Sequence, residues 1–435
     1  GHLAGYCATL VSYTGIFNSQ GGCYYTRMLQ SHLFAKTLRE APKDDVSVNA
    51  ELLIRGGFVD KLVAGVWTFL PLGWRVLEKI NTIIREEMNA IGGVELHMPT
   101  LQPRDLWETT DRWKVEESYK LQDRSGRDFC LGWTHEEAVT KIALSHISSY
   151  RDLPQYVYQI QTKFRDEPRA KSGVIRGREF LMKDLYSFNA TREDLDAFYE
   201  VAKAAYHKIF ERTGLKAYCV EASGGAFTKE YSHEFQVVSD AGEDEIIYCK
   251  ECSFARNKEI IGDVTSCPNC KKPLASNKSI EVGNIFKLGT KFSEAFGLSF
   301  TDEKGEKKPV IMGSYGIGPG RLVGTIVEVS HDDRGIIWPE SVAPFRVHVL
   351  ALSPSVKEEA QKVIFDLEQK GIEVLFDDRE GKTPGERFSD ADLIGISWRV
   401  VVSEKTVKEG KIEVKRRTES DATLMDTASF IKLVC

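Results

Sequence analysis

Residues 156–188 read YVYQIQTKFRDEPRAKSGVIRGREFLMKDLYSF and carry the clearest information about the fold. Two runs rich in aromatic and aliphatic residues, 156–164 and 180–188, are typical of strands. Guanidinium groups bind phosphate oxygens through paired hydrogen bonds, so the intervening loop predicts an anionic ligand such as a nucleoside triphosphate. A charged hairpin in solvent is the alternative interpretation. The cations of this loop are Arg165, Arg169, Lys171, Arg176 and Arg178.

A second loop, Gly316-Ile317-Gly318-Pro319-Gly320-Arg321, lies between an expected strand and an apolar helix within residues 307–329. Glycine lets the backbone approach a ligand closely, and Arg321 would stand at a helix N-terminus, where phosphate is favoured. The spacing is not that of a dinucleotide-binding loop. Taken alone, a tight turn between strand and helix explains this loop equally well.

Four cysteines form two C-x-x-C pairs separated by 14 residues. The spacing predicts a zinc ribbon over residues 247–275 with a structural role, because four thiolates leave no open position for catalysis. A disulfide pair is the less favoured alternative in a cytosolic protein. The predicted ligands are Cys249, Cys252, Cys267 and Cys270.

Composition limits the remaining possibilities. The 435 residues are enough for two or three domains, and the net charge of −6 argues against a protein that coats nucleic acid. No apolar run reaches the roughly 18–20 residues that span a bilayer. The scattered cysteines Cys130, Cys219 and Cys435 are typical of reduced thiols in the cytoplasm.

Periodicity outlines two larger units. Apolar positions predict helices over 75–91 and over 191–213, the second opened by Thr191 with Asp194 as a capping box, and a strand over 94–99. Pro339 and Pro344 mark a boundary. Beyond it, strands over 347–352, 373–376 and 399–402 alternate with a helix, which predicts a small separate α/β domain.

Taken together, the two loops resemble the second and third motifs of class II aminoacyl-tRNA synthetases, and the helix and strand ending at Pro99 resemble the first. The chain is most similar to prolyl-tRNA synthetases of the bacterial type, over essentially residues 28–435. The stretches that carry this resemblance are 70–74, 134–137, 177–184, 232–235, 281–286 and 390–396.

The resemblance implies an α+β catalytic domain over residues 28–343, with a mixed, mainly antiparallel sheet flanked by helices and with the ribbon inserted in it. An α/β anticodon-binding domain over 345–435 would follow. Residues 1–27 fit neither domain, and we expect a disordered or non-native leader there, with Met28 as the natural start.

The implied activity is a proline–tRNA ligase that forms prolyl-adenylate from proline and ATP with Mg²⁺ and then charges the tRNA for proline. A cytoplasmic homodimer that binds neither membrane nor DNA is expected. A non-catalytic, synthetase-like tRNA-binding or regulatory protein is the alternative. A threonine or serine enzyme is a further alternative, against which the Thr134-His135-Glu136 loop argues.

The resemblance also assigns roles to individual residues. Arg165 and Arg321 would be catalytic. The ATP site would comprise Arg165, Glu167, Arg176, Glu281, Asn284, Gly318, Gly320 and Arg321, with Glu281 as a magnesium ligand. The proline site would comprise Thr134, Glu136, Arg165, Phe180, His233 and Phe286. The anticodon contacts would come from Asp378, Arg379, Arg387 and Phe388, with phosphate contacts from Lys405, Lys408 and Lys411.

Two departures from the family pattern stand out. Trp133 replaces the proline that usually precedes the threonine, which puts the geometry of that loop in question. Bacterial relatives commonly carry a large hydrolytic insertion between the second and third motifs that removes misattached alanine. Only 14 residues separate the cysteine pairs here, so no domain of roughly 100–200 residues fits, and the ribbon takes its place.

Overall fold

The computed structural model describes the chain from Arg27 onward with short gaps. Strands β1 (Gly15–Phe17) and β2 (Cys23–Tyr25) are described for their backbone alone. The leader predicted over residues 1–27 lies mostly outside the described residues, as do Arg169 and Lys171 of the cationic loop. The described ranges are 27–41, 47–168, 170, 172–222, 232–252, 254–260, 264 and 266–435.

The central sheet is mixed and mainly antiparallel, as the sequence predicts. The strands expected around the cationic loop form its β10–β11 hairpin, and parallel pairings occur at β10–β6 and β12–β15. The strand order is β13 (Ser232–Val238), β12 (Ala217–Ala222), β15 (Ala255–Asn257), β14 (Asp244–Cys249), β16 (Leu274–Gly289), β19 (Ile311–Ile317), β11 (Glu179–Asn189), β10 (Gln155–Phe164) and β6 (Val94–Glu95), and β13 also pairs with β16.

Long helices supply much of the core. Tyr199 and Tyr206 of α5 are fully buried with Ile80 and Ile84 of α2 and Leu322 of α7 in one apolar cluster. Burial of such side chains is the main favourable term in folding. The helices of this domain are α1 (Val48–Arg55), α2 (Pro71–Ala90), α3 (Arg104–Glu108), α4 (Glu136–Ala143), α5 (Arg192–Arg212), α6 (Lys291–Phe296) and α7 (Pro319–Val329).

Two predicted boundaries differ from the structure. α2 begins at Pro71 rather than at residue 75, because proline at the first helical position loses no hydrogen bond. The strand predicted over 94–99 ends at Glu95, because the backbone of Met98 bonds side chains instead of a strand. Its N–H donates to Gln159 Oε1 at 3.0 Å, and its carbonyl accepts from Gln161 Nε2 at 2.8 Å.

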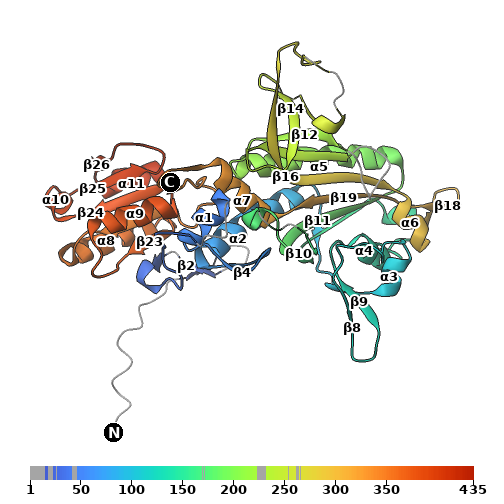
Figure 1. Ribbon diagram of the computed structural model, residues 1–435, viewed down its shortest axis with the longest axis horizontal. Helices are drawn as coiled ribbons and strands as arrows, with labels where there is room; N and C mark the ends of the chain where they lie inside the picture. Colours follow the sequence, from blue (N-terminus) through green and yellow to red (C-terminus); the bar gives the residue numbers. More distant parts are fainter. Residues whose placement is uncertain are drawn as a thin grey trace, which may run out of the picture.

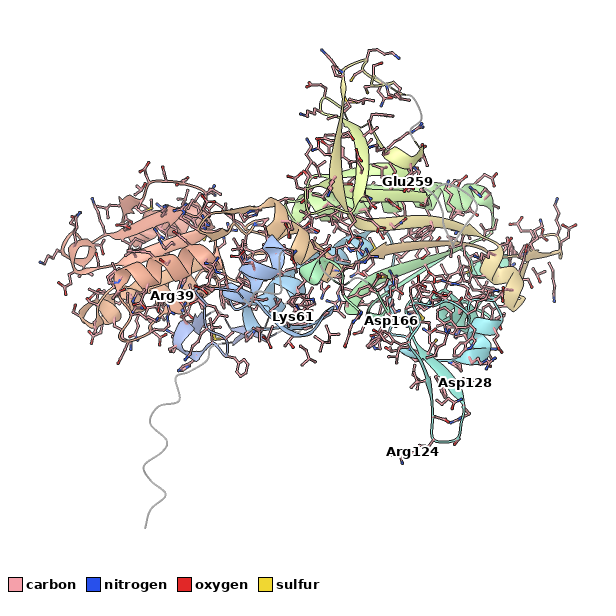
Figure 2. The ribbon with its side chains drawn as sticks, viewed as in Figure 1. Arg39, Lys61, Arg124, Asp128, Asp166 and Glu259 are labelled. Atoms are coloured by element: carbon pink, nitrogen blue, oxygen red, sulfur yellow. The ribbon has the colours of Figure 1, made fainter. Side chains whose placement is uncertain are left out.

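Short hairpins complete the N-terminal domain. In Figure 1 the ribbon hairpin at β14 and the hairpin β8–β9 project from opposite sides of it, and Figure 2 labels Arg124 and Asp128 on the β8–β9 hairpin. These strands are β4 (Val59–Val63), β5 (Val66–Phe69), β7 (Leu101–Pro103), β8 (Lys120–Gln122), β9 (Asp128–Leu131), β17 (Ser299–Thr301), β18 (Lys307–Pro309), β20 (His331–Asp332) and β21 (Gly335–Ile336).

The C-terminal domain forms one end of the molecule (Figure 1). Its sheet has the order β26 (Thr423–Met425), β25 (Ile412–Arg416), β24 (Trp398–Val402), β22 (Val347–Ala351), β23 (Val374–Asp377) and β3 (Arg27–Leu29). Its helices are α8 (Lys357–Glu368), α9 (Pro384–Ile394), α10 (Glu404–Lys408) and α11 (Thr427–Val434). Strand β3 comes from the N-terminal segment, although the sequence places residues from 28 on in the predicted N-terminal domain.

Specific contacts join the two domains. Trp338 Nε1 donates to the Ile394 carbonyl at 3.0 Å, and Lys79 of α2 pairs with Glu373. Gly395, which ends α9 with φ +77°, packs so closely on β21 that an added Cβ would lie 2.1 Å from the Ile336 carbonyl oxygen. The domain junction therefore requires glycine there, both for its backbone conformation and for space.

Replacing Gly395 with alanine should lower the thermal midpoint of unfolding well beyond the effect of backbone strain. Gly381 is the matched control, because it has nearly the same φ of +74° but no atom within 4 Å of an added Cβ. Left-handed strain alone costs about 1 kcal/mol, so G381A should shift the midpoint modestly and G395A several-fold more. Equal shifts in calorimetry would contradict the close domain contact.

Candidate active site

A cleft of about 190 Å³ opens on the central sheet where β10, β11, β16 and β19 meet the start of α7. The structure brings most of the predicted ATP and proline residues together in its lining. They are Thr134, Glu136, Arg165, Glu167, Arg176, Phe180, Glu281, Asn284, Phe286, Gly318 and Arg321.

Glu136 is the first residue of α4 and is almost fully buried. Thr134 Oγ1 donates a hydrogen bond to one carboxylate oxygen, and Ser314 Oγ on β19 donates to the other at 3.0 Å. A buried carboxylate needs such partners to remain ionised. Since the Thr134 hydroxyl donates its hydrogen bond to Glu136, the lone pairs of its oxygen can still accept a hydrogen bond from a ligand. The pair can therefore receive a small cation.

Arg165 directs a positive charge into the cleft. Its Nε donates to the Trp133 carbonyl at 3.4 Å, and its guanidinium lies 5.3 Å from the centre of the Phe180 ring. Among the described residues no carboxylate forms an ion pair with it within 4.0 Å. Burial and the nearby Arg321 lower its pKa, although an arginine stays charged at neutral pH. An anion bound at this point would offset both the burial of the Arg165 charge and its repulsion by Arg321.

Arg321 stands in the first turn of α7 and is held by strand β16. Its Nη1 donates to the carbonyl and to the carboxylate of Glu281 at 2.9 and 3.1 Å. Asn284 Nδ2 bonds the other Glu281 oxygen at 3.0 Å. Neighbouring Glu234, which the sequence analysis missed, has its pKa raised to about 8 by burial and by the charge of Glu281. This end of the cleft thus holds an arginine beside clustered carboxyl groups.

Glu167 and Arg176 face each other across the cationic loop. Arg176 Nε donates to Glu167 Oε2 at 2.9 Å, and the Arg176 guanidinium also pairs with Glu243. The backbone closes the base of the loop through Arg165 N–H to the Arg178 carbonyl at 2.8 Å. In this state Arg176 is engaged by carboxylates, so it must exchange partners to hold a phosphate.

Two predicted residues lie elsewhere. His233 is turned toward helix α5, where its Nδ1 lies 2.9 Å from the Tyr199 hydroxyl, and it does not line the cleft. Successive side chains of a strand point to opposite faces, so Glu234 lies on the side of Asn284 instead. Gly320 lies under Phe69, 3.5 Å from where its Cβ would be, rather than in the lining.

Other contributors lack a local sequence signal. Lys163 and Asp184 form a fully buried ion pair of 2.7 Å, and Asp184 forms part of the cleft lining. These residues lie on the adjacent strands β10 and β11, and buried charges are stable only when paired. Because side chains alternate between the two faces of a strand, the sequence weakly indicates that Lys163 and Asp184 share one face of the sheet. Arg112, far away in sequence, lies 3.6 Å from Glu136, and only the fold reveals that proximity.

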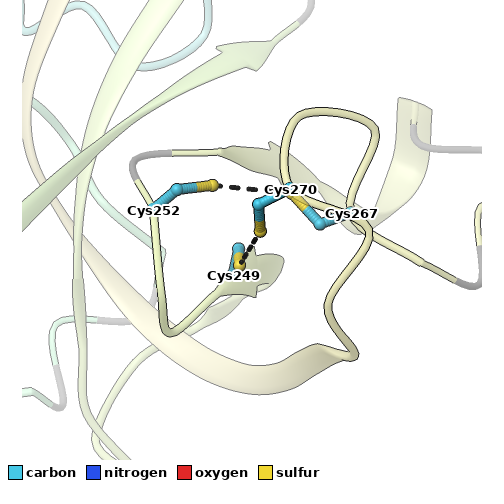
Figure 3. Close-up of side chains that lie close together, drawn as sticks. All are labelled: Cys249, Cys252, Cys267 and Cys270. Atoms are coloured by element: carbon cyan, nitrogen blue, oxygen red, sulfur yellow. Dashed lines mark hydrogen bonds between the residues drawn. The ribbon is translucent and has the colours of Figure 1, made fainter.

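The four ribbon cysteines converge as predicted (Figure 3). Their sulfur atoms all lie within 4.8 Å of one another, with Cys249–Cys270 at 3.4 Å and Cys252–Cys267 at 3.5 Å. Zinc–thiolate bonds of about 2.3 Å in a tetrahedron place sulfurs about 3.8 Å apart. The donor set therefore fits a structural zinc ion.

The expected anticodon residues serve largely within the C-terminal domain. Arg387 is 6% exposed and bonds the Asp377 side chain and the Asp377 carbonyl. Arg379 pairs with Asp377 and Asp390, and Asp378 accepts two bonds from Ser31. Phe388 lies 4.8 Å from the Arg399 guanidinium. The anticodon contacts expected from these four residues stay a prediction, and Arg387 also supports the local structure from within helix α9.

Family models match both parts of the chain. The model for the class II tRNA synthetase core domain (G, H, P, S and T) matches residues 119–330, and the model for the anticodon binding domain matches residues 346–434. Among the described residues, no helix has the length and apolar character needed to cross a membrane.

Curated relatives match nearly the whole chain. Proline–tRNA ligase of Dehalococcoides mccartyi strain CBDB1 is 35% identical over 94% of this chain and 98% of its own length. The proline–tRNA ligase of Persephonella marina is 36% identical over 92% of this chain and 98% of its own length. The first alignment spans 560 positions against the 435 residues here, so that relative holds at least 125 residues without a counterpart.

Solved structures match the fold. Prolyl-tRNA synthetase from Cryptosporidium parvum, in complex with L-proline and AMP, superimposes with a TM-score of 0.73 at 18% identity, over 88% of this chain and 74% of that one.

Proposed function

The chain belongs to the family of proline–tRNA ligases, and from this premise we propose how its side chains divide the reaction. The enzyme activates proline with ATP and joins it to tRNA. The observation that carries the division of roles is the charge of Arg165, which faces the cleft without an ion-pair partner among the described residues.

In the first step the proline carboxylate attacks the α-phosphate of ATP. The carboxylate is already ionised, so positioning and charge stabilisation replace a general base. Arg165 lies between this carboxylate and the α-phosphate and stabilises the charge that develops there. Arg321 and Arg176 hold the outer phosphates, and Glu167 turns from Arg176 toward the adenine. These roles are supported by the position of all four side chains in the lining of one cleft.

Glu136 receives the secondary ammonium of proline, and the Thr134 oxygen accepts its second hydrogen. The hydrogen bonds from Thr134 and Ser314 support this role, because they fix the carboxylate before the substrate arrives. Phe180 and Phe286, which line the same cleft, form walls for the ring.

Magnesium accompanies ATP in class II enzymes, and the carboxylate of Glu281 is the group that would hold it. Oxygen ligands of this kind suit Mg²⁺. The ion supplies charge neutralisation at the phosphates when bound. Glu281 reaches the cleft with both oxygens fixed by Asn284 and Arg321, which supports the assignment.

The assembly and its location are also proposals. Exposed apolar side chains at the β4–β5 hairpin and at the start of α2, namely Leu62, Val63 and Trp74, support a homodimer through this face. A molar mass of a single chain in light scattering would contradict the homodimer. None of the described cysteines forms a disulfide, which supports the cytoplasm as the location.

Replacing Glu136 with glutamine should raise the KM for proline in ATP–pyrophosphate exchange by about tenfold to a hundredfold, since a buried charge pair is lost. The KM for ATP should change by less than about twofold. The exposed Glu116, replaced in the same way, is the control. Exchange by the unaltered protein that is absent with proline, or faster with threonine or serine, would overturn the proposed specificity.

Zinc removal should loosen the ribbon without abolishing activation. The purified protein should contain about one zinc per chain, and Cys267→Ser should lose it, because three thiolates bind far less tightly. The variant Cys219→Ser, outside the cluster, should retain the metal. A zinc content below one tenth per chain in the unaltered protein would contradict the assignment.

We propose that the ribbon occupies the place of the hydrolytic insertion. A pocket shaped for proline admits the smaller alanine, and each missing methylene discriminates by only about 1–3 kcal/mol. The enzyme should therefore mischarge some alanine and leave alanyl-tRNA intact. Incubation with preformed alanyl-tRNA for proline tests this, and hydrolysis faster than the spontaneous rate would refute it.

A further inference from the structure

Arg112 is a buried arginine just after α3, and it lies against the base of the proline site. Its guanidinium is enclosed by aromatic rings, 4.6 Å from the centre of Trp133, 5.4 Å from Trp107 and 5.3 Å from Phe292. The two tryptophans also stack on each other at 5.6 Å. Such enclosure fixes the position of the cation.

This cation serves two adjacent carboxylates. Arg112 Nη1 lies 2.9 Å from Glu137 Oε1 and 3.6 Å from Glu136 Oε2. Thr110 Oγ1 adds a bond to Glu137 at 2.7 Å. Glu137 is fully buried, and burial raises its pKa, while Arg112 acts against that rise. Two buried like charges this close are stable only beside a cation.

Other charged groups act on the same pair. Lys163 is engaged by Asp184 at 2.7 Å, so its charge is largely balanced. Arg165 lies on the side of the cleft where the substrate carboxylate is expected. Lys291 of α6 interacts electrostatically with both Glu136 and Glu137. Tyr186 lies near Glu136 and also bonds Asp184. Arg112 is therefore the ionic partner within 4.0 Å of both Glu136 and Glu137 among the described residues.

We propose that Arg112 is a positioning residue for proline selection, whose buried charge balances Glu137 and keeps Glu136 available as a carboxylate for the ring ammonium. The proposal rests on the proline-binding role proposed for Glu136. With the substrate bound, two carboxylates face two cations, and the buried site is neutral. Without Arg112, the carboxylate pair takes up a proton that weakens the contact with the ammonium.

The test is ATP–pyrophosphate exchange by three variants, with the KM for proline measured from about pH 6 to about pH 9. R112Q removes the charge and should raise the KM for proline about tenfold or more near neutral pH. Since higher pH removes the added proton, this KM should fall as the pH rises. R112K retains a charge and should recover most of the affinity. The KM for ATP should stay within about twofold throughout.

A compensating variant separates charge balance from a purely structural role. R112Q/E137Q loses one cation and one anion, so its KM for proline should return toward that of the unaltered enzyme and lose its dependence on pH. R104Q is the matched control, because Arg104 lies in the same region, 5.5 Å from the Trp113 ring, but pairs with the half-exposed Asp128 and with exposed Glu108. It should leave both KM values unchanged.

Each result decides the inference. An R112Q enzyme with an unchanged KM for proline overturns it, as does an R112Q/E137Q enzyme impaired as strongly as E136Q. If R112Q does not fold, the double variant takes its place: a KM for proline near that of the unaltered enzyme supports the inference, and impairment as strong as that of E136Q overturns it. If E136Q itself leaves the KM for proline unchanged, the proposed proline site falls, and the role of Arg112 falls with it. If E136Q is impaired and R112Q is not, the role of Arg112 alone is rejected.

Discussion

The cleft is organised around the positive charge of Arg165. Its side chain begins where β10 ends, and its N–H bonds the Arg178 carbonyl to close the loop that leads into β11. The antiparallel neighbours β19 and β16 then place Ser314, Glu281 and Asn284 along the same cleft. Because nearby arginines repel one another, the arrangement is completed only when an anion arrives. The rigid sheet keeps these side chains in place before the anion binds, since side chains on paired strands have little freedom to move apart.

Glu136 provides the complementary charge at the other end. It is held by Thr134 from its own loop and by Ser314 from β19. A zwitterion with a carboxylate and a secondary ammonium therefore finds opposite charges at the two ends. The stacked tryptophans and Arg112 lie outside the cleft lining and shape this end from behind. Trp133, the departure from the usual family residue, thus takes a defined structural role between Arg112 and Arg165.

Local sequence patterns predicted the fold well where the physical cause is local. The capping box at Thr191 and Asp194 fixed the start of α5, and the alternation of strands and helices after Pro344 separated the C-terminal domain. The same patterns carry less information where segments distant in sequence determine the structure. Nothing near Arg27–Leu29 indicates that it pairs with β23, and His233 is turned toward Tyr199 by the alternation of β13. Arg379 and Arg387, from which anticodon contacts are predicted, both pair with the buried Asp377 of β23.

A crystal structure with proline and a non-hydrolysable ATP analogue tests the central claim most directly. The account predicts the proline ring nitrogen within hydrogen-bond distance of Glu136 and Thr134, and the Arg165 guanidinium between the proline carboxylate and the α-phosphate. A ring nitrogen turned away from Glu136, or an α-phosphate held without Arg165, would contradict it.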